Sequence, residues 1–492
     1  MRPMDAVSSR PMLLGDSLRS VLTEGGRVLT EPAELVPYEC DGLSAIRETP
    51  RAVVLPQTEA EVGRVLRFCD QHRIPVVARG AGTGLSGGAR GHRDGIVLSL
   101  ARLNAVHEIN VNAQRAVVGP GVTNLKISEV AAPYGLYYAP DPSSQIACTI
   151  GGNVAENSGG VHCLKYGLTI HNVLGVRGFT PQGEWIEIDG ARLDSPGQSL
   201  LPLIIGSEGL LMVVTQVIVK LKPKPPLARV VMASFDDVEK AAAAVAAIIS
   251  EGVIPAGLEM MDKGAVQAVE PFSKAGYDVN AEAILLVETD GTPLEVAEEL
   301  VQLTRILTAS GASGIQVSEN EEQRLRFWSG RKSAFPAAGR ISADYYCMDG
   351  TLPRKQVGKI LSAIREMEQR YQLGCLNVFH AGDGNLHPLI LFDANRPGDW
   401  EKAEAFGAEI LRLCVQWGGT ITGEHGVGVE KILGMCEQFT PSELAHFHAL
   451  RAVFDPHQIM NPEKLLPTLK RCVEEGRVHA HAPTPFAHLP RF

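Results

Sequence analysis

The sequence contains no hydrophobic run long enough to cross a membrane. The longest run, near residues 210–219, is broken by Thr215 and Gln216, and it falls far short of the roughly 20 residues that a spanning helix needs. The N-terminal stretch MRPMDAVSSRPMLLGDSLRS has no apolar core of the kind found in secretory signal peptides. We therefore expect no direct membrane span and a cytoplasmic protein, with membrane attachment only through partner subunits.

Cysteine, aromatic residues and positive charge are also scarce. The 492 residues include nine cysteines, which are scattered without a C-x-x-C pair, and this excludes a disulfide scaffold, a zinc ribbon and an iron–sulfur protein. Aromatic residues make up 5% and the net charge is -10, which argues against nucleic acid as a partner. A hydrophobic content of 45% is typical of globular proteins, and the length indicates two or three domains.

Two histidines flank a predicted tight turn in NVFHAGDGNLHPLILFD, residues 377–393. Apolar stretches on both sides of AGDGN predict a β-hairpin, which would bring His380 and His387 to one point. Glu424 in GTITGEHGVG could add a carboxylate. Two imidazole nitrogens and one carboxylate, with coordination positions left open, are typical of a catalytic metal site. The alternative is that both histidines are hydrogen-bonded turn residues.

Residues 1–50 predict a helical lead-in, and a strand–helix–strand unit follows. The strands are expected at 51–56 and 74–78, and the helix at 58–70, with Thr58 as its N-cap and Glu61 completing a capping box. The glycine-rich run ARGAGTGLSGG comes next and matches G-x-G-x-x-G. A strand rather than a helix follows it, which excludes a Rossmann dinucleotide fold. Its backbone N–H groups could instead wrap a pyrophosphate, the alternative being a flexible surface loop.

A second block of small residues, PDPSSQIACTIGGNVAENSGG, spans 140–160. Small residues let the backbone lie against a large planar ligand, and Thr, Ser and Asn supply hydrogen bonds to it. A third small-residue turn, GSEG, precedes a strand at 210–221, and KPKPP marks a domain boundary. Beyond it, alternating strands and helices over 228–425 predict a ferredoxin-like cap, an antiparallel sheet with helices on one face.

Together these motifs resemble the FAD-binding flavoproteins of the vanillyl-alcohol oxidase and p-cresol methylhydroxylase class. The resemblance is carried by ARGAGTGLSGG, PDPSSQIACTIGGNVAENSGG, GSEG, FHAGDGNLHP, GEHGVG and MNPEK, and it covers most of the chain. Within the class the sequence most resembles the FAD-linked dehydrogenases of D-2-hydroxy acids, among them the flavin subunit of bacterial glycolate oxidase. The implied fold is α+β. Its parts are the lead-in at 1–50, a two-part FAD-binding domain at 51–227, a cap with the metal site at 228–425, a C-terminal helical segment at 426–470 that packs back on the FAD domain, and a disordered tail at 471–492.

The resemblance implies that the glycine-rich loops cradle FAD. Covalent members of the class carry a flavin-bonding histidine in the first loop, and Thr83 stands at that position here, so we expect non-covalent FAD. The implied cofactor-binding residues are Arg79, Gly80, Gly82, Thr83, Gly84, Ser86, Gly87, Pro140, Asp141, Ser143, Thr149, Gly151, Gly152, Asn153, Asn157, Ser158, Gly159, Gly160, Ser207, Glu208, Gly209 and Asn461.

The resemblance also implies a metal-assisted oxidation. His380, His387 and Glu424 are expected to hold one divalent ion, for which zinc, manganese and iron(II) are equally suited. The ion would bind the substrate hydroxyl and lower its pKa. His425 is expected to take the hydroxyl proton as general base, and the hydride would pass to flavin N5.

A buried substrate carboxylate needs a cation, and arginine pairs with carboxylates in a bidentate way. Arg331 is the expected partner, because related enzymes place an arginine three residues after the tryptophan that is Trp328 here. The alternative is a surface role for Arg331, in which case Arg340 is the reserve candidate.

The expected activity is the oxidation of a short D-2-hydroxy acid. Glycolate, which would give glyoxylate, is the first-choice substrate. Enzymes acting on D-2-hydroxyglutarate carry polar residues where Phe335, Cys347 and Leu389 stand here, and an unpaired second carboxylate would be costly. The implied partners are FAD-like and iron–sulfur subunits of a glycolate oxidase complex. The alternatives are a stand-alone D-lactate dehydrogenase and, from another class, a non-redox transferase that resembles alkylglycerone-phosphate synthase.

Overall fold

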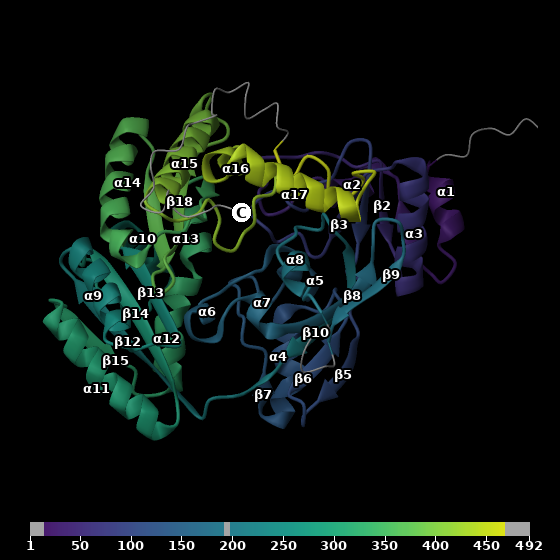
Figure 1. Ribbon diagram of the computed structural model, residues 1–492. Coiled ribbons are helices and arrows are strands. Elements are labelled where there is room, and N and C mark those ends of the chain that lie inside the picture. Colours follow the sequence, from purple (N-terminus) through teal and green to yellow (C-terminus); the bar gives the residue numbers. More distant parts are fainter. Residues whose placement is uncertain (1–13, 191–196, 468–492) are drawn as a thin grey trace, which may run out of the picture.

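A computed structural model describes residues 14–190 and 197–467 of the chain. Figure 1 shows one lobe coloured purple to blue and a second lobe coloured teal to green. The yellow helices α16 (Ile432–Gln438) and α17 (Pro441–Phe454) pass from the second lobe back over the first. The tail expected at 471–492 lies outside the described residues. In the two described ranges, no helix combines the length and the apolar character needed to cross a bilayer.

The first lobe begins with a four-stranded sheet in the order β1-β2-β4-β3. Strands β2, β4 and β3 run parallel, and α3 connects β2 to β3, which confirms the predicted strand–helix–strand unit. Thr58 caps α3, since its side chain accepts a hydrogen bond from the amide of Glu61. The bounds are β2 (Ala52–Leu55), α3 (Glu59–His72), β3 (Val76–Arg79) and β4 (Ile96–Ser99).

The lead-in contributes a strand as well as helices. Besides α1 (Leu14–Val21) and α2 (Pro32–Leu35), it contains β1 (Arg27–Leu29), which pairs antiparallel with β2. The buried Glu61 carboxylate accepts a hydrogen bond from the amide of Glu24 in this segment. The expected capping box is therefore not formed: Glu61 ties the lead-in to the sheet instead.

The second sheet of this lobe is antiparallel, in the order β5-β6-β10-β8-β9. The second small-residue block contains a short helix, α5, that packs against β10 of this sheet. A two-stranded pair, β7 with β11, closes the lobe. The strands are β5 (Val106–Asn110), β6 (Arg115–Val118), β7 (Leu136–Tyr137), β8 (Val173–Phe179), β9 (Trp185–Asp189), β10 (Val213–Lys220) and β11 (Lys222–Pro223). The helices are α4 (Asn124–Ala131), α5 (Ile150–Glu156), α6 (Cys163–Tyr166), α7 (Thr169–Asn172) and α8 (Leu201–Ile204).

The second lobe is built on one seven-stranded antiparallel sheet, β15-β12-β14-β13-β17-β18-β16. This confirms the α+β class expected for the cap. The strands are β12 (Leu227–Phe235), β13 (Gly257–Asp262), β14 (Ala283–Gly291), β15 (Gly314–Val317), β16 (Asp344–Cys347), β17 (Cys375–His380) and β18 (Asn385–Phe392). The helices are α9 (Val238–Ser250), α10 (Lys263–Ser273), α11 (Pro293–Ala309), α12 (Glu321–Lys332), α13 (Ala334–Ile341), α14 (Val357–Tyr371) and α15 (Asp399–Gln416).

Helices cover both faces of this sheet, not one face as expected. Val231 and Ala233 of β12 belong to the core formed with α9, α11, α14 and α15. Their neighbours Val230 and Met232 belong to a separate core with α10, α12 and α13. The cause is visible in the sequence, because β12 is apolar at consecutive positions and a strand buried on both faces shows no alternation. This second layer matters for the site, since α12 carries Arg331.

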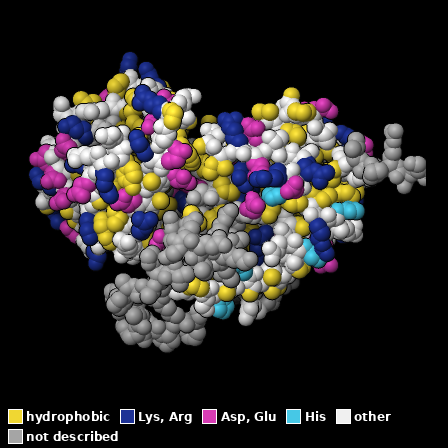
Figure 2. All heavy atoms as spheres, turned by 90° about the horizontal axis from the view of Figure 1, so that it is seen from above, with side chains coloured by type: hydrophobic (Ala, Val, Ile, Leu, Met, Phe, Trp, Pro, Cys, Tyr) yellow, Lys and Arg dark blue, Asp and Glu magenta, His cyan; other side chains and the backbone are white. Residues whose placement is uncertain are grey.

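Charged side chains around His162 join the two lobes. The His162 ring lies between a carboxylate of each lobe. Its Nδ1 is 2.7 Å from the Asp141 carboxylate in the first lobe, and its Nε2 is 3.1 Å from the Glu288 carboxylate on β14 in the second. Arg324 of α12 pairs with the same Glu288 at 2.7 Å. Burial acts to lower the pKa of His162, but the two carboxylates outweigh it and hold this pKa well above its ordinary value. On the face seen in Figure 2, acidic and basic side chains are interspersed over both lobes.

Exchanging His162 for glutamine is expected to destabilise the protein most below about pH 6.5. A raised folded-state pKa gives stability that is fully present below the unfolded-state pKa and is lost as the pH rises through the folded-state pKa. Losing hydrogen bonds to a charged ring predicts a cost of about 2 kcal/mol. Thermal midpoints of the variant and the wild type should differ clearly near about pH 6 and converge at alkaline pH. A pH-independent difference would contradict a charged His162.

Candidate active site

The predicted β-hairpin brings its two histidines together. His380 ends β17, and His387 is the third residue of β18. The centroids of the two imidazole rings lie 5.0 Å apart, and both residues are buried. Their ring nitrogens are not satisfied by the turn itself: His380 Nδ1 contacts Glu259, and His387 Nδ1 lies 3.3 Å from the carbonyl oxygen of Met348.

Glu424 stands between the two rings. Its Oε1 lies 3.1 Å from Nε2 of His380 and 2.9 Å from Nε2 of His387. Burial acts to raise the pKa of Glu424, but the two imidazoles outweigh it and the pKa lies well below its ordinary value. One imidazole nitrogen on each side of a carboxylate oxygen offers the donor types that a divalent transition metal prefers, so in donor chemistry these residues fit the ion that the resemblance implies.

Two sets of ligand atoms among the described residues lie close enough together to hold an ion, and both contain His387 but neither contains His380. In each set, one ligand atom from every residue lies within 4.8 Å of the others. The sets are Asp349, His387, Glu424 and His425, and Cys347, His387 and His425. Asp349 is otherwise engaged, because its carboxylate accepts hydrogen bonds from the Thr422 hydroxyl at 2.6 Å and from the amides of Glu424 and His425 at 3.2 and 2.9 Å. Asp349 thus holds the GEHGVG loop in place.

The imidazole ring of His425 is stacked on that of His387. Their centroids lie 4.9 Å apart with an interplanar angle of 16°. The Nδ1 atom of His425 is buried and has no hydrogen-bond partner within residues 14–190 and 197–467. Burial lowers the pKa of His425 to about 4, so the ring is neutral at physiological pH. A neutral imidazole with a vacant nitrogen is able to accept a proton.

Arg331 is buried at the edge of this cluster. Its Nε donates a hydrogen bond to Glu259 Oε2 at 2.8 Å, and the residue is 2% exposed. The surface role considered as an alternative is therefore wrong. The reserve candidate Arg340 is exposed and lies over the ring of Phe272, 5.4 Å from its centroid. Arg340 does not line the cavity described next, so it is not a candidate for this site.

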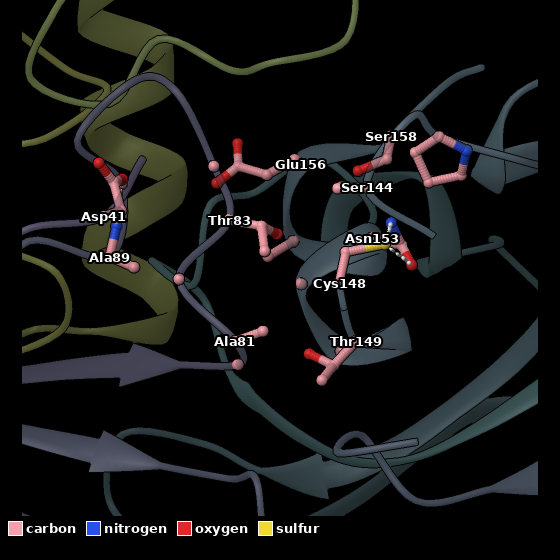
Figure 3. Close-up of a pocket in the computed structure, with 18 of the residues that line it drawn as sticks. Asp41, Ala81, Thr83, Ala89, Ser144, Cys148, Thr149, Asn153, Glu156 and Ser158 are labelled. Carbon is pink, nitrogen blue, oxygen red and sulfur yellow. Dashed lines mark hydrogen bonds between the residues drawn. The ribbon is translucent and has the colours of Figure 1, made fainter. Parts of the chain in front are cut away.

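One cavity of about 420 Å³ connects the glycine-rich loops to this cluster. Figure 3 shows Thr83 of the first loop and Thr149 of the second block at its wall, with Glu156 nearby. Arg331, His387, Glu424 and His425 line the same cavity, but His380 does not. Most of the predicted cofactor-binding residues line it: Arg79, Gly80, Gly82, Thr83, Gly84, Ser143, Thr149, Gly151, Gly152, Asn153, Ser158, Ser207, Glu208, Gly209 and Asn461.

The cradle is suited to a closely packed ligand. A Cβ atom on Gly80 would lie 2.2 Å from Thr149 Oγ1, so glycine at this position makes room for the Thr149 side chain of the second block. Gly82 has a φ of +72°, a conformation that favours glycine. The Thr149 hydroxyl is buried, lines the cavity and has no hydrogen-bond partner in the part of the chain that the structure describes. These features fit the FAD that the resemblance implies.

The other predicted cofactor residues support the loops and do not line the cavity: Ser86, Gly87, Pro140, Asp141, Asn157, Gly159 and Gly160. The carbonyl oxygen of Ser86 accepts hydrogen bonds from the amides of Val429 and Glu430, and Asp141 binds His162. A Cβ atom on Gly159 would lie 2.5 Å from Glu424 Oε2. Glycine at this position therefore lets the second block approach the metal-ligand candidate.

Two of the lining residues also join distant parts of the chain. The Glu208 carboxylate accepts hydrogen bonds from the amides of Val427 and Gly428, both at 2.7 Å. The amide of Asn461 donates to the carbonyl oxygen of Val76 on β3. The segment after α17 thus packs against the first lobe.

Sequence reasoning missed several buried acids at this site. Asp41 and Glu156 line the cavity, and Glu259 and Asp349 hold the ionic cluster. Each is a single residue outside the conspicuous motifs or, like Glu156, a charged residue inside a motif that was interpreted through its small residues. Only the three-dimensional contacts distinguish them from ordinary core or surface acids.

Known proteins resemble the chain over nearly its whole length. Residues 50–189 match the family described as "FAD binding domain", and residues 224–465 match "FAD linked oxidases, C-terminal domain". The glycolate oxidase subunit GlcD of Escherichia coli K12 is 55% identical over 469 residues, covering 95% of this chain and 94% of its own. The D-lactate dehydrogenase of Archaeoglobus fulgidus is 32% identical over 419 residues, covering 84% and 91%. The solved structure of p-cresol methylhydroxylase superposes with a TM-score of 0.77 at 17% identity, covering 93% and 96%, a likeness of fold.

Proposed function

Because the chain belongs to the family of FAD-linked oxidases, we propose that it is a dehydrogenase of a short D-2-hydroxy acid, with glycolate as the preferred substrate and glyoxylate as the product. The observation that carries this proposal is the shared cavity. The same space is lined by the glycine-rich loops that fit FAD and by Arg331, His387, Glu424 and His425. A small hydroxy acid held by these side chains lies within the cavity that receives the flavin.

The chain's own residues have three tasks in this reaction. Arg331 orients the substrate carboxylate, since its guanidinium is fixed at Nε and lines the cavity. His425 accepts the proton of the substrate hydroxyl, because its ring is neutral and none of the described residues hydrogen-bonds to its buried Nδ1. The buried surroundings exclude water from these groups. When bound, non-covalent FAD supplies the two-electron acceptor for the hydride on C2.

His380, His387 and Glu424 would hold one divalent ion, zinc, manganese or iron(II). Such an ion supplies Lewis acidity toward the substrate oxygens. The choice of His380 over Asp349 as third ligand rests on the contacts of each, because Asp349 is occupied by the GEHGVG loop whereas Nε2 of His380 reaches Glu424 directly.

Of Phe335, Cys347 and Leu389, the first favours a substrate with one carboxylate. Phe335 lines the cavity, and its ring packs edge-on against Tyr345, 5.8 Å between centroids. Leu389 is fully buried, and it faces Cys347 across β16 and β18, where the Cys347 thiol donates to the carbonyl oxygen of Met348. Phe335 offers no partner to a second carboxylate in the cavity, which would remain unpaired at a cost on the order of a few kcal/mol, whereas Cys347 and Leu389 do not line the cavity.

We further propose that electrons leave the reduced flavin through partner subunits, one FAD-like and one an iron–sulfur protein, attached to the membrane. The relative from E. coli is named as a subunit of a glycolate oxidase. The nine scattered cysteines of this chain contain no C-x-x-C pair that would bind a cluster of its own.

The test is to mix the purified holoprotein anaerobically with individual 2-hydroxy acids and to monitor reduction of the flavin through the loss of its absorbance. Glycolate is expected to bleach the flavin faster than D-lactate, and D-2-hydroxyglutarate should be the poorest of the three. Rapid bleaching by D-lactate and none by glycolate would instead favour a D-lactate dehydrogenase. No bleaching by any hydroxy acid would leave a non-redox transferase as the better explanation.

A further inference from the structure

We propose that Glu259 is a positioning residue that orients two parts of the active site at once, the imidazole of His380 and the guanidinium of Arg331. This inference rests on the proposed function, in which those two groups serve the metal and the substrate carboxylate. Glu259 lies in none of the motifs that carry the family resemblance, and it is 1% exposed in the middle of β13.

The two carboxylate oxygens of Glu259 have separate partners. Oε1 lies 2.7 Å from Nδ1 of His380, and Oε2 accepts the hydrogen bond from Nε of Arg331 at 2.8 Å. Strand pairing explains the first contact: Met260 faces Phe379 in the antiparallel register of β13 and β17, so the next pair along places Glu259 opposite His380. The second contact comes from α12, which packs on this face of the sheet.

The contact with His380 selects one tautomer of its ring. A carboxylate oxygen can only accept, so Nδ1 of His380 carries a proton toward Glu259 Oε1, and Nε2, which lies 3.1 Å from Glu424 Oε1, is the ring nitrogen that remains for a metal ion. His387 is oriented more weakly, since its Nδ1 lies 3.3 Å from a backbone carbonyl oxygen. A charged outer partner also makes an imidazole a stronger donor to a metal ion.

The contact with Arg331 fixes the direction of the guanidinium. With Nε used by Glu259, the two terminal nitrogens remain for bidentate binding of a carboxylate. The backbone amide of Arg331 is held separately, by the hydroxyl of Tyr277 at 3.1 Å. The direction of the Arg331 side chain therefore depends on Glu259, whereas the position of α12 does not.

The proposal predicts a variant with two linked defects. In Glu259→Gln, the amide keeps the volume of the side chain but presents a donor at one of the two positions, so one contact must be lost or both distorted. Metal affinity is expected to fall about 10–100-fold, as it does when outer partners of a metal ligand are removed. The KM for glycolate should rise as well, because Arg331 loses its fixed direction.

The matched control is Asp262→Asn, in the same strand. The Asp262 side chain caps α10 by accepting from the amide of Ala265 at 2.8 Å and accepts from the Asn377 amide at 2.7 Å, and it does not line the cavity. The measurements are titration of the metal-stripped proteins with Zn²⁺ and Mn²⁺, FAD content, thermal midpoint and steady-state KM and kcat. Wild-type FAD content with weakened metal binding and raised KM in Glu259→Gln alone supports the proposal.

The outcomes separate a structural role from a positioning role. Metal affinity and KM within twofold of the wild type in Glu259→Gln would overturn the proposal. If Glu259→Gln loses FAD and fails to fold, Glu259→Asp replaces it as the test variant, because it retains the buried charge but withdraws the carboxylate from both partners. Weakened metal binding and a raised KM are expected in Glu259→Asp as well. The absence of both defects in Glu259→Asp would overturn the proposal. Failure of wild-type flavin reduction by glycolate would count against the proposed function instead, and the metal titration would still test Glu259.

Discussion

Replacing His425 with alanine is expected to abolish reduction of the flavin by glycolate while FAD stays bound. His425 is the one ring of the three-histidine cluster whose buried Nδ1 has no hydrogen-bond partner among the described residues. Removing a positioned general base typically costs about 10²–10⁴-fold in rate. Its loss deprives the substrate hydroxyl of a proton acceptor, and the glycine-rich loops keep their contacts.

The measurement is anaerobic stopped-flow reduction at saturating glycolate, with FAD and metal contents determined on the same samples. His446 offers a control, since it is an exposed residue of α17 whose Nδ1 contacts only the carbonyl oxygen of Ser442 in the preceding turn. His446→Ala should reduce its flavin at the wild-type rate. If the flavin of His425→Ala is reduced at a rate within a few-fold of the wild-type rate, His425 is not the general base.

The stacking of His425 on His387 adds a second requirement to this test. Alanine at 425 leaves one face of the His387 ring uncovered, so the metal ligand could shift. A variant that loses both metal and rate does not isolate proton transfer, whereas one that retains metal and loses rate does. His425→Gln fills more of the space and is expected to show the same loss of rate with metal retained.

The sequence predicted the parts of the site that depend on local patterns. The hairpin between His380 and His387 follows from turn formers between two apolar runs, and the N-cap of α3 follows from a threonine before an amphipathic stretch. Such features are encoded within a few residues of one another. The proximity of the two imidazoles follows from the antiparallel pairing of β17 and β18 alone.

What the sequence did not predict comes from long-range contacts. Glu259 meets Arg331 and His380 across 72 and 121 positions, and a buried glutamate in a strand has no local signature that names its partners. The helices on the second face of the cap sheet were missed because only one face was assigned to the core. Glu61 was expected to complete a capping box, but its carboxylate instead accepts hydrogen bonds from the amides of Gln57 and of Glu24 and Gly26, and the last two lie 37 and 35 positions away in the sequence.

Removing the divalent ion is expected to abolish flavin reduction, and His380→Ala is expected to have the same effect permanently. In wild type, prolonged chelation should stop reduction while FAD remains, and adding zinc, manganese or iron(II) should restore it. The ion that restores the highest rate identifies the working metal. In His380→Ala, added metal should not restore activity, because losing a direct ligand costs more than the roughly 10–100-fold in affinity that the loss of an outer partner costs.

Cys347→Ala distinguishes the predicted set of His380, His387 and Glu424 from the set that contains Cys347. Cys347 lies within reach of His387 and His425, and a site built on that set would lose its ion when the thiol is removed. The thiol, however, already donates to the Met348 carbonyl oxygen, and burial raises the pKa of Cys347 well above its ordinary value, so a thiolate ligand is disfavoured. Metal retained in Cys347→Ala and lost in His380→Ala assigns the ion to the hairpin and Glu424. The reverse pattern would move the ion to the other side of His387 and leave His380 as a purely structural partner of Glu259.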